Sequence, residues 1–259
     1  MVSKTEAILP FVNIAAFIIT LIINGLSNTT LIGGRTTADV SNMYPTLITP
    51  AGYVFAIWGV IYVLLAIFLV YQALPSQRGK PFQKQINGLF ILTNVFNVSW
   101  LFLWQNLYLS FSIILIIGFL LSLIAIYLKL NIGKSKAPLK EKLAVHLPFS
   151  VYLGWLTIAT IANITVALTA ANWDGFGIAA ETWAILVLAV ALLITLAVIL
   201  THRDIAFSLV VIWALAGIAV NQTNSTVILT AEIGIIIIAV VLIAVLAVQR
   251  LRKRKNDSK

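Results

Sequence analysis

The chain has 259 residues, of which 61% are hydrophobic and only 10% are charged, and its mean hydropathy is +1.05. Water-soluble domains do not have this composition, so the sequence predicts a polytopic membrane protein. Long, unbroken apolar runs favour helices over a barrel, and the expected fold class is therefore an all-α transmembrane helical bundle. The chain has no cysteine, which excludes disulfides, thiolate metal sites and a cysteine nucleophile.

Eight apolar segments are candidate membrane spans. They are residues 7–26, 51–71, 87–107, 109–128, 147–168, 183–200, 205–220 and 226–248. The seventh is short, which leaves a seven-span arrangement open as the main alternative. The lipid bilayer is thus the first expected partner.

Basic residues are distributed unevenly between the two sides of this arrangement. With eight spans, 16 of the 17 lysines and arginines fall in the termini and the even-numbered loops, and only Arg35 falls on the other side. The positive-inside rule then predicts that both termini are cytoplasmic, with the plasma (inner) membrane as the expected location. Because topology explains the net charge of +9, nucleic acid is not an expected partner.

The connections suggest three parts. Residues 1–168 form a predicted ligand-binding bundle, residues 169–249 a three-helix extension, and residues 250–259 a basic cytoplasmic tail. The longest connection, residues 27–50, contains Pro45 and Pro50, which favour an ordered, extended strip over the bundle.

Three spans each carry a stripe of aromatic and polar residues at helical spacing. The residues are Trp58 and Tyr62 in the second span, Asn97, Trp100 and Trp104 in the third, and Tyr152, Trp155 and Asn163 in the fifth. Rings at this depth lie below the interfacial belt, and we expect them to line an apolar pocket with a few polar anchors. The alternative is that these rings only fill the bundle core.

Ionisable residues are scarce within the spans. Glu232 is the one carboxylate placed inside a span, near an end, while His146 and His202 fall at span ends. Ion-coupled carriers use acids near the midplane, so the pattern favours binding over a permease or a membrane subunit of a transport complex, which stays the rival function. We expect no metal site and no required cofactor.

The three stripes resemble motifs of the TspO/translocator protein family, the tryptophan-rich sensory proteins. Trp58-x3-Tyr62 resembles its second-helix motif, Asn97-x2-Trp100 its third-helix motif, and the series from Tyr152 through Trp155 to Asn163 its fifth-helix motif. This resemblance covers about residues 7–168. It implies a five-helix bundle that binds tetrapyrroles or sterol-like molecules, often as a homodimer, and that has no counterpart of the last three spans.

The predicted function is therefore binding of a planar, hydrophobic small molecule, such as a tetrapyrrole, in an intramembrane pocket, with a sensory, regulatory or transport-associated role. The protein is not expected to be an enzyme, since porphyrin degradation rests on family analogy alone. Because all three motifs end by Asn163, the last three spans are expected to be dispensable for binding.

Overall fold

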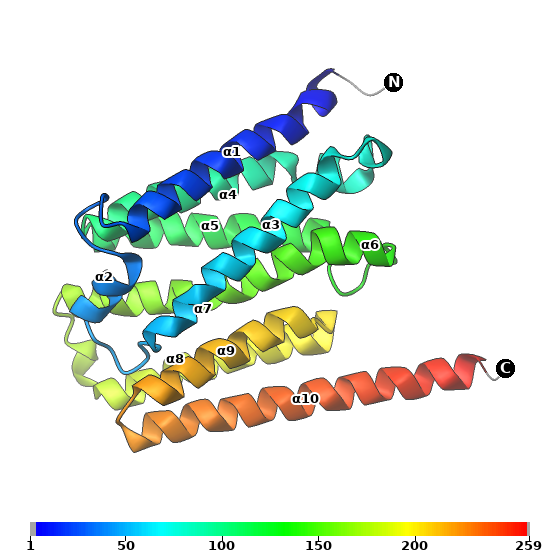
Figure 1. Cartoon of the computed structure of the whole chain (residues 1–259). Coiled ribbons are helices and arrows are strands. Elements are labelled where there is room, and N and C mark those ends of the chain that lie inside the picture. Colours follow the sequence, from blue (N-terminus) through cyan, green and yellow to red (C-terminus); the bar gives the residue numbers. More distant parts are fainter. Residues whose placement is uncertain (1–3, 258–259) are drawn as a thin grey trace. The chain divides into compact units, whose positions relative to one another are not determined.

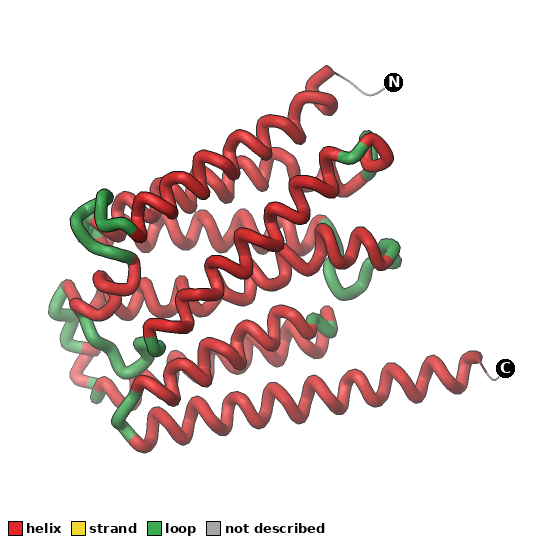
Figure 2. Tube along the Cα trace, viewed as in Figure 1, coloured by secondary structure: helices red, strands yellow, loops and turns green. Residues whose placement is uncertain are grey.

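The structure is a computed structural model that describes residues 4–257, with side chains for residues 8–251. Over this range the regular secondary structure is helical, and the remaining chain forms connections between helices (Figure 2). Seven of the described helices are long and apolar enough to cross a membrane, and the 17-residue helix over the seventh predicted span is a shorter apolar one. The predicted all-α transmembrane bundle is thus confirmed.

The long helices follow the predicted spans closely. In chain order, the α-helices are α1 (Lys4–Asn28), α2 (Thr37–Met43), α3 (Ile57–Ala73), α4 (Pro81–Gln105), α5 (Leu109–Lys129), α6 (Leu139–Glu141), α7 (Leu147–Ala170), α8 (Ala180–His202), α9 (Ile205–Asn221) and α10 (Ser225–Asp257). A 3-10 helix, Gly52–Ala56, precedes α3, and a π-helical turn, Lys142–His146, joins α6 to α7.

Two predicted boundaries need correction. The second span is not one continuous α-helix, because its first turn is the 3-10 helix that ends at Ala56. The third begins at Pro81 rather than Asn87, since proline is well suited to a first helical position. Lys84 therefore lies on α4 and not in the preceding loop.

The chain divides into two compact units, and each is described by itself. The first unit contains Met1–Thr46 and Phe55–Trp173. Its five long helices form a closed ring in the order α1, α4, α5, α7 and α3, each packed against the next, with α3 back against α1. Figure 1 shows α1 running alongside α4, and α3 alongside α7.

A ladder of uncharged polar side chains joins α1 to α4. The pairs are Asn13–Asn87, Thr20–Asn94, Asn24–Asn97 and Ser27–Gln105, with donor–acceptor distances of 2.7–3.0 Å. Such bonds hold transmembrane helices together, typically by about 0.6 kcal/mol and up to about 1.7 kcal/mol each. The ladder explains how α1, whose sequence carries no aromatic stripe, is fixed in the ring.

The connection from α1 to α3 is not the extended strip that the prolines suggested. Thr36 and Asp39 form a capping box, with reciprocal hydrogen bonds of 2.8 and 3.1 Å that start α2. Hydrogen bonding of the Asp39 carboxylate with the backbone N–H and then the side chain of Thr36 also holds the pKa of Asp39 below its usual value. The expectation of an extended strip rested on Pro45 and Pro50, whereas Thr36 and Asp39 carry the signal for this helix.

The second unit contains Leu47–Val54 and Asp174–Lys259. Helices α8, α9 and α10 each pack against the other two. The turn from α8 to α9 is tight, with Arg203 in the left-handed conformation and the Asp204 carboxylate accepting from the N–H of Phe207 at 3.1 Å. The unit also includes eight residues that precede α3 in the chain.

The predicted three-part division stays a prediction as a functional statement. The boundary between the two compact units falls between Trp173 and Asp174, and residues Leu47–Val54 belong to the second unit. Helix α10 continues to Asp257, so the start of the predicted basic tail at residue 250 falls within a helix. The side chains of residues 252–259 in that tail lie outside the described part.

Candidate functional site

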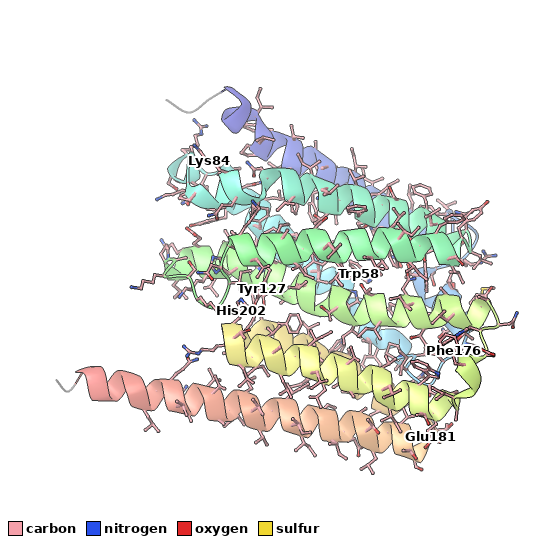
Figure 3. All side chains as sticks on the ribbon, turned by 180° about the vertical axis from the view of Figure 1, so that it is seen from behind. Trp58, Lys84, Tyr127, Phe176, Glu181 and His202 are labelled. Atoms are coloured by element: carbon pink, nitrogen blue, oxygen red, sulfur yellow. The ribbon has the colours of Figure 1, made fainter. Side chains whose placement is uncertain are left out.

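Trp58 stands at the centre of an aromatic cluster in the first unit. It lies in the first turn of α3, directly after the 3-10 helix, and it is half-buried. Figure 3 shows Trp58 among the helices of this unit, whereas Lys84 lies toward one end of α4. One turn later on the same helix face, Tyr62 stacks against Trp58 with ring centroids 5.7 Å apart.

The other two predicted stripes converge on the same ring. From α4, Trp100 stacks with Trp58 at a centroid distance of 6.4 Å. From α7, Tyr152 and Trp155 present their edges to Trp58 at 5.9 and 6.2 Å. Residues from three helices, widely separated in sequence, thus form one aromatic cluster, and these distances fall in the range in which aromatic pairs attract one another.

Asn163 is fully engaged by protein partners. Its Oδ1 accepts the indole N–H of Trp100 at 2.7 Å, and its Nδ2 donates to the hydroxyl of Ser112 at 3.0 Å. Ser112 in turn donates to the carbonyl oxygen of Leu109 at 2.7 Å. The amide that sequence reasoning assigned to a ligand here fixes the orientation of the Trp100 ring.

Asn97 has a similar position in the network. Its Oδ1 accepts from Asn24 of α1 at 2.8 Å, and its Nδ2 donates to the hydroxyl of Tyr152 at 3.3 Å. Asn97 therefore connects the α1–α4 ladder to the aromatic cluster and is completely buried.

Trp104 extends the cluster toward the first connection. Its ring stacks with Trp100 at 5.8 Å, and its indole N–H donates to the carbonyl oxygen of Thr37 at 3.1 Å. Two further contacts secure the same connection, since Arg35 donates to the Gln105 carbonyl at 3.0 Å and the Gln105 side chain donates to the Arg35 carbonyl at 2.8 Å. Trp104 thus links the cluster to α2.

Two polar atoms in the cluster stand out because they are buried and lack a good protein partner. Across the residues whose side chains are described, nothing accepts the indole N–H of Trp155, a residue that is only 2% exposed. The hydroxyl of Tyr62 lies near the amide of Asn97 but makes no hydrogen bond of good geometry within that same range. A buried donor without an acceptor is costly, so both atoms are candidates for contact with a ligand.

Sequence reasoning missed several members of the site. Phe55, three residues before Trp58, contacts the ring of Trp155 at 5.9 Å, and Phe119 of α5 contacts Tyr152 at 5.4 Å. Ser112, on the same helix as Phe119, holds Asn163. The spacing of Phe55 from Trp58 was a usable signal, but one serine and one phenylalanine among several in the apolar span of α5 were not.

The two histidines lie where the sequence placed them, at helix ends. His146 ends the π-helical turn before α7 and is buried, and His202 is the last residue of α8. Among the side chains of residues 8–251, no three His, Cys, Asp or Glu residues are grouped as a metal site would require.

Comparison with known proteins matches the chain to a family. The family model described as TSPO-like protein matches residues 10–246, a range that begins in α1 and ends in α10. The match therefore extends beyond the motifs of the first unit and includes α8 and α9. No curated protein and no solved structure matches the chain.

Proposed function

The chain belongs to the TSPO-like protein family, and from this premise and the aromatic cluster we propose that it binds a planar, hydrophobic small molecule inside its first unit. A tetrapyrrole or a sterol-like molecule has the right chemistry. The observation that carries the proposal is the convergence of Trp58, Trp100 and Trp155 from three membrane-spanning helices on one cluster.

Chemical character supports binding rather than catalysis. The side chains around Trp58 are aromatic rings, and the polar groups behind them are amides and hydroxyls. Aromatic faces stack on flat ligands without requiring a particular substituent pattern, and neutral amides and hydroxyls orient a ligand without transferring protons. We therefore propose a sensory or regulatory role. We also propose that the protein lies in the plasma (inner) membrane, needs no cofactor and forms a homodimer that binds the ligand.

Trp155 supplies the most direct polar contact for such a ligand. Its ring contacts both Phe55 and Trp58, and its N–H is buried without an acceptor in the described structure. Tetrapyrrole and sterol ligands carry carboxylate or hydroxyl oxygens that can accept this hydrogen bond. We assign Trp58 and Trp100 to stacking, and Trp155 to both stacking and hydrogen bonding.

The test uses Trp155→Phe, which keeps a ring and removes the indole N–H. Because that N–H has no acceptor among the described residues, its loss should not lower the free energy of unfolding, and the smaller ring should lower it by only about 1 kcal/mol. Affinity for protoporphyrin IX, measured by fluorescence quenching in detergent micelles, should fall by about tenfold, which corresponds to about 1.4 kcal/mol. A tenfold loss of affinity with no more than this small loss of stability is what a ligand contact predicts.

Trp183→Phe is the control, because Trp183 belongs to the second unit and its N–H donates to the carbonyl oxygen of Gly175 at 2.9 Å. It should lower stability but leave protoporphyrin IX binding unchanged. If Trp155→Phe and Trp183→Phe reduce affinity equally, or if neither does, the rings are packing residues and the proposed site is wrong.

A further inference from the structure

Within the second unit, helix α10 is much longer than the two helices it packs against. It has 33 residues, whereas α8 has 23 and α9 has 17. Short connections join α8 to α9 and α9 to α10, and each reverses the direction of the chain, so α8 and α10 run in the same direction (Figure 1).

The two parallel helices begin at the same level. Asn224, the residue before α10, donates from its side chain to the carboxylate of Glu181 in the first turn of α8 at 3.2 Å. The Oδ1 of Asn224 also accepts the N–H of Val227 at 3.0 Å, which fixes the start of α10. The difference in length between α8 and α10 therefore appears entirely at their other ends.

The last ten residues of α10, 248–257, project beyond the end of α8, and this segment is here called the projecting end. At the rise of an α-helix, ten residues extend by about 15 Å. Figure 3 shows α10 continuing past His202, the last residue of α8. No other helix of the second unit extends as far at this end within the described residues.

The projecting end is strongly basic. Its one acidic residue is Asp257, and its five basic residues are Arg250, Arg252, Lys253, Arg254 and Lys255. The segment contains neither proline nor glycine, and the helix of the span continues through it without a break. Membrane topology requires basic residues beside a span, but it does not require them to lie on the helix of the span itself. The helix keeps these five residues at a fixed distance from the apolar part of α10.

That distance corresponds to the headgroup layer of a bilayer. Arg250 lies about 38 Å, and Lys255 about 45 Å, along the helix axis from Ser225. A bilayer is about 30 Å thick in its hydrocarbon core and about 40–45 Å thick with its headgroups. Because α10 begins among polar residues, including Glu181, its start belongs to one headgroup layer, and the basic residues then fall in the opposite one.

Two side chains at the beginning of the projecting end agree with this placement. Leu251, which is 66% exposed, lies between two arginines, as expected where hydrocarbon meets headgroups. The Nε2 atom of Gln249 is buried and has no acceptor among the described residues, and the next residue, Arg250, is exposed. A lipid phosphate oxygen can accept hydrogen bonds from both an amide and a guanidinium group.

We propose that the projecting end of α10 binds the phosphate headgroups of anionic phospholipids and so concentrates these lipids around the second unit. Basic residues clustered directly beside a membrane span attract anionic headgroups, each contributing to the affinity. The partner is lipid rather than a soluble polyanion, because the basic residues follow the apolar part of the helix without any intervening linker. The proposal is independent of the ligand proposed for the first unit.

The test measures lipid enrichment beside the projecting end in the full-length protein. The chain has no cysteine, so a donor fluorophore is attached to Val248→Cys, a position that is 47% exposed. The protein is reconstituted in phosphatidylcholine nanodiscs that contain a trace of acceptor-labelled phosphatidylglycerol or, separately, acceptor-labelled phosphatidylcholine. Leu229→Cys, near the opposite end of α10 and 55% exposed, carries the donor in the reference protein.

At Val248→Cys, phosphatidylglycerol should be enriched over phosphatidylcholine by about fivefold, and at Leu229→Cys the two lipids should be equal. High salt should reduce the enrichment, because it screens charges at the membrane surface. Replacing all five basic residues of the projecting end by glutamine should abolish it. Glutamine is a good helix former, so the helix should persist, which far-ultraviolet circular dichroism checks.

The matched control removes the same number of charges from the first unit. It replaces five lysines that lie between the start of the α5–α7 connection and α7, namely Lys129, Lys134, Lys136, Lys140 and Lys142, by glutamine. This control should keep the enrichment at Val248→Cys. Equal loss in both variants would mean that net charge alone attracts the lipid, and equal energy transfer from the two labelled lipids in the unaltered sequence would mean that the basic residues only set topology. Either result overturns the proposal.

Discussion

Replacing Asn163 by leucine separates a structural role of this amide from a role in ligand binding. Asn163 accepts the indole N–H of Trp100 at 2.7 Å, and both residues are at least 94% buried. Leucine fills a similar volume but leaves that indole N–H without an acceptor. A buried donor without a partner costs about 1–3 kcal/mol, while measured hydrogen bonds between transmembrane helices reach only about 1.7 kcal/mol. We therefore expect Asn163→Leu to destabilise the first unit by about 1.5 kcal/mol.

The assay is a double-mutant cycle with Trp100→Phe, measured by reversible unfolding in mixed micelles. Once the indole N–H is gone, Asn163→Leu should cost much less, because Ser112 keeps its bond to the carbonyl oxygen of Leu109 at 2.7 Å. The coupling between the two sites should be about 1 kcal/mol. Strictly additive effects would refute the assignment of Asn163 as the acceptor that orients Trp100.

Three further outcomes are expected. Gly118→Ala should destabilise the protein by about 1–3 kcal/mol, because its Cβ would lie 2.6 Å from the ring of Phe96, whereas Gly88→Ala, which meets nothing within 4 Å, should stabilise it slightly in the same unfolding assay. For the topology, a single cysteine replaces Thr30 or Ser258 in this cysteine-free chain; Ser258 lies outside the described residues. An impermeant thiol reagent applied to whole cells should label the cysteine at position 30 but not the one at position 258. The reverse pattern would contradict cytoplasmic termini. Vesicles containing only this protein should bind protoporphyrin IX without accumulating it, and accumulation would favour the rival permease function.

Helical spacing was enough to predict that the three tryptophan-bearing stripes come together, but not that Phe55 and Phe119 join them. Trp58, Trp100 and Trp155 each lie on a stripe, and a buried ring with a polar edge requires protein neighbours, so three such stripes tend to face one another. Spacing does not indicate which buried polar atom is left without a hydrogen-bond partner in the protein. Only the geometry shows that Asn97 and Asn163 are engaged by the protein, whereas the N–H of Trp155 is not.

Other parts of the fold were beyond such reasoning for identifiable physical reasons. In the second unit, residues Leu47–Val54 bind α9 through their backbone, and the main-chain groups of Thr49, Ala51 and Val54 leave no mark on side-chain periodicity. Gly217 was visible in the sequence, but a single glycine in an apolar span does not say what approaches it. Helix α2 was signalled by Thr36 and Asp39, and the prolines that follow it received more weight.

The α1–α4 ladder bears on how the site keeps its shape. Asn97 accepts from Asn24 and donates to Tyr152, so the position of α1 is coupled through one amide to a ring that contacts Trp58. The orientation of Trp58 is thus coupled to α1 through uncharged side chains. Because this coupling uses no ionised group, the orientation of Trp58 should be insensitive to pH and to salt, and should respond instead to changes in hydrogen bonding at Asn97.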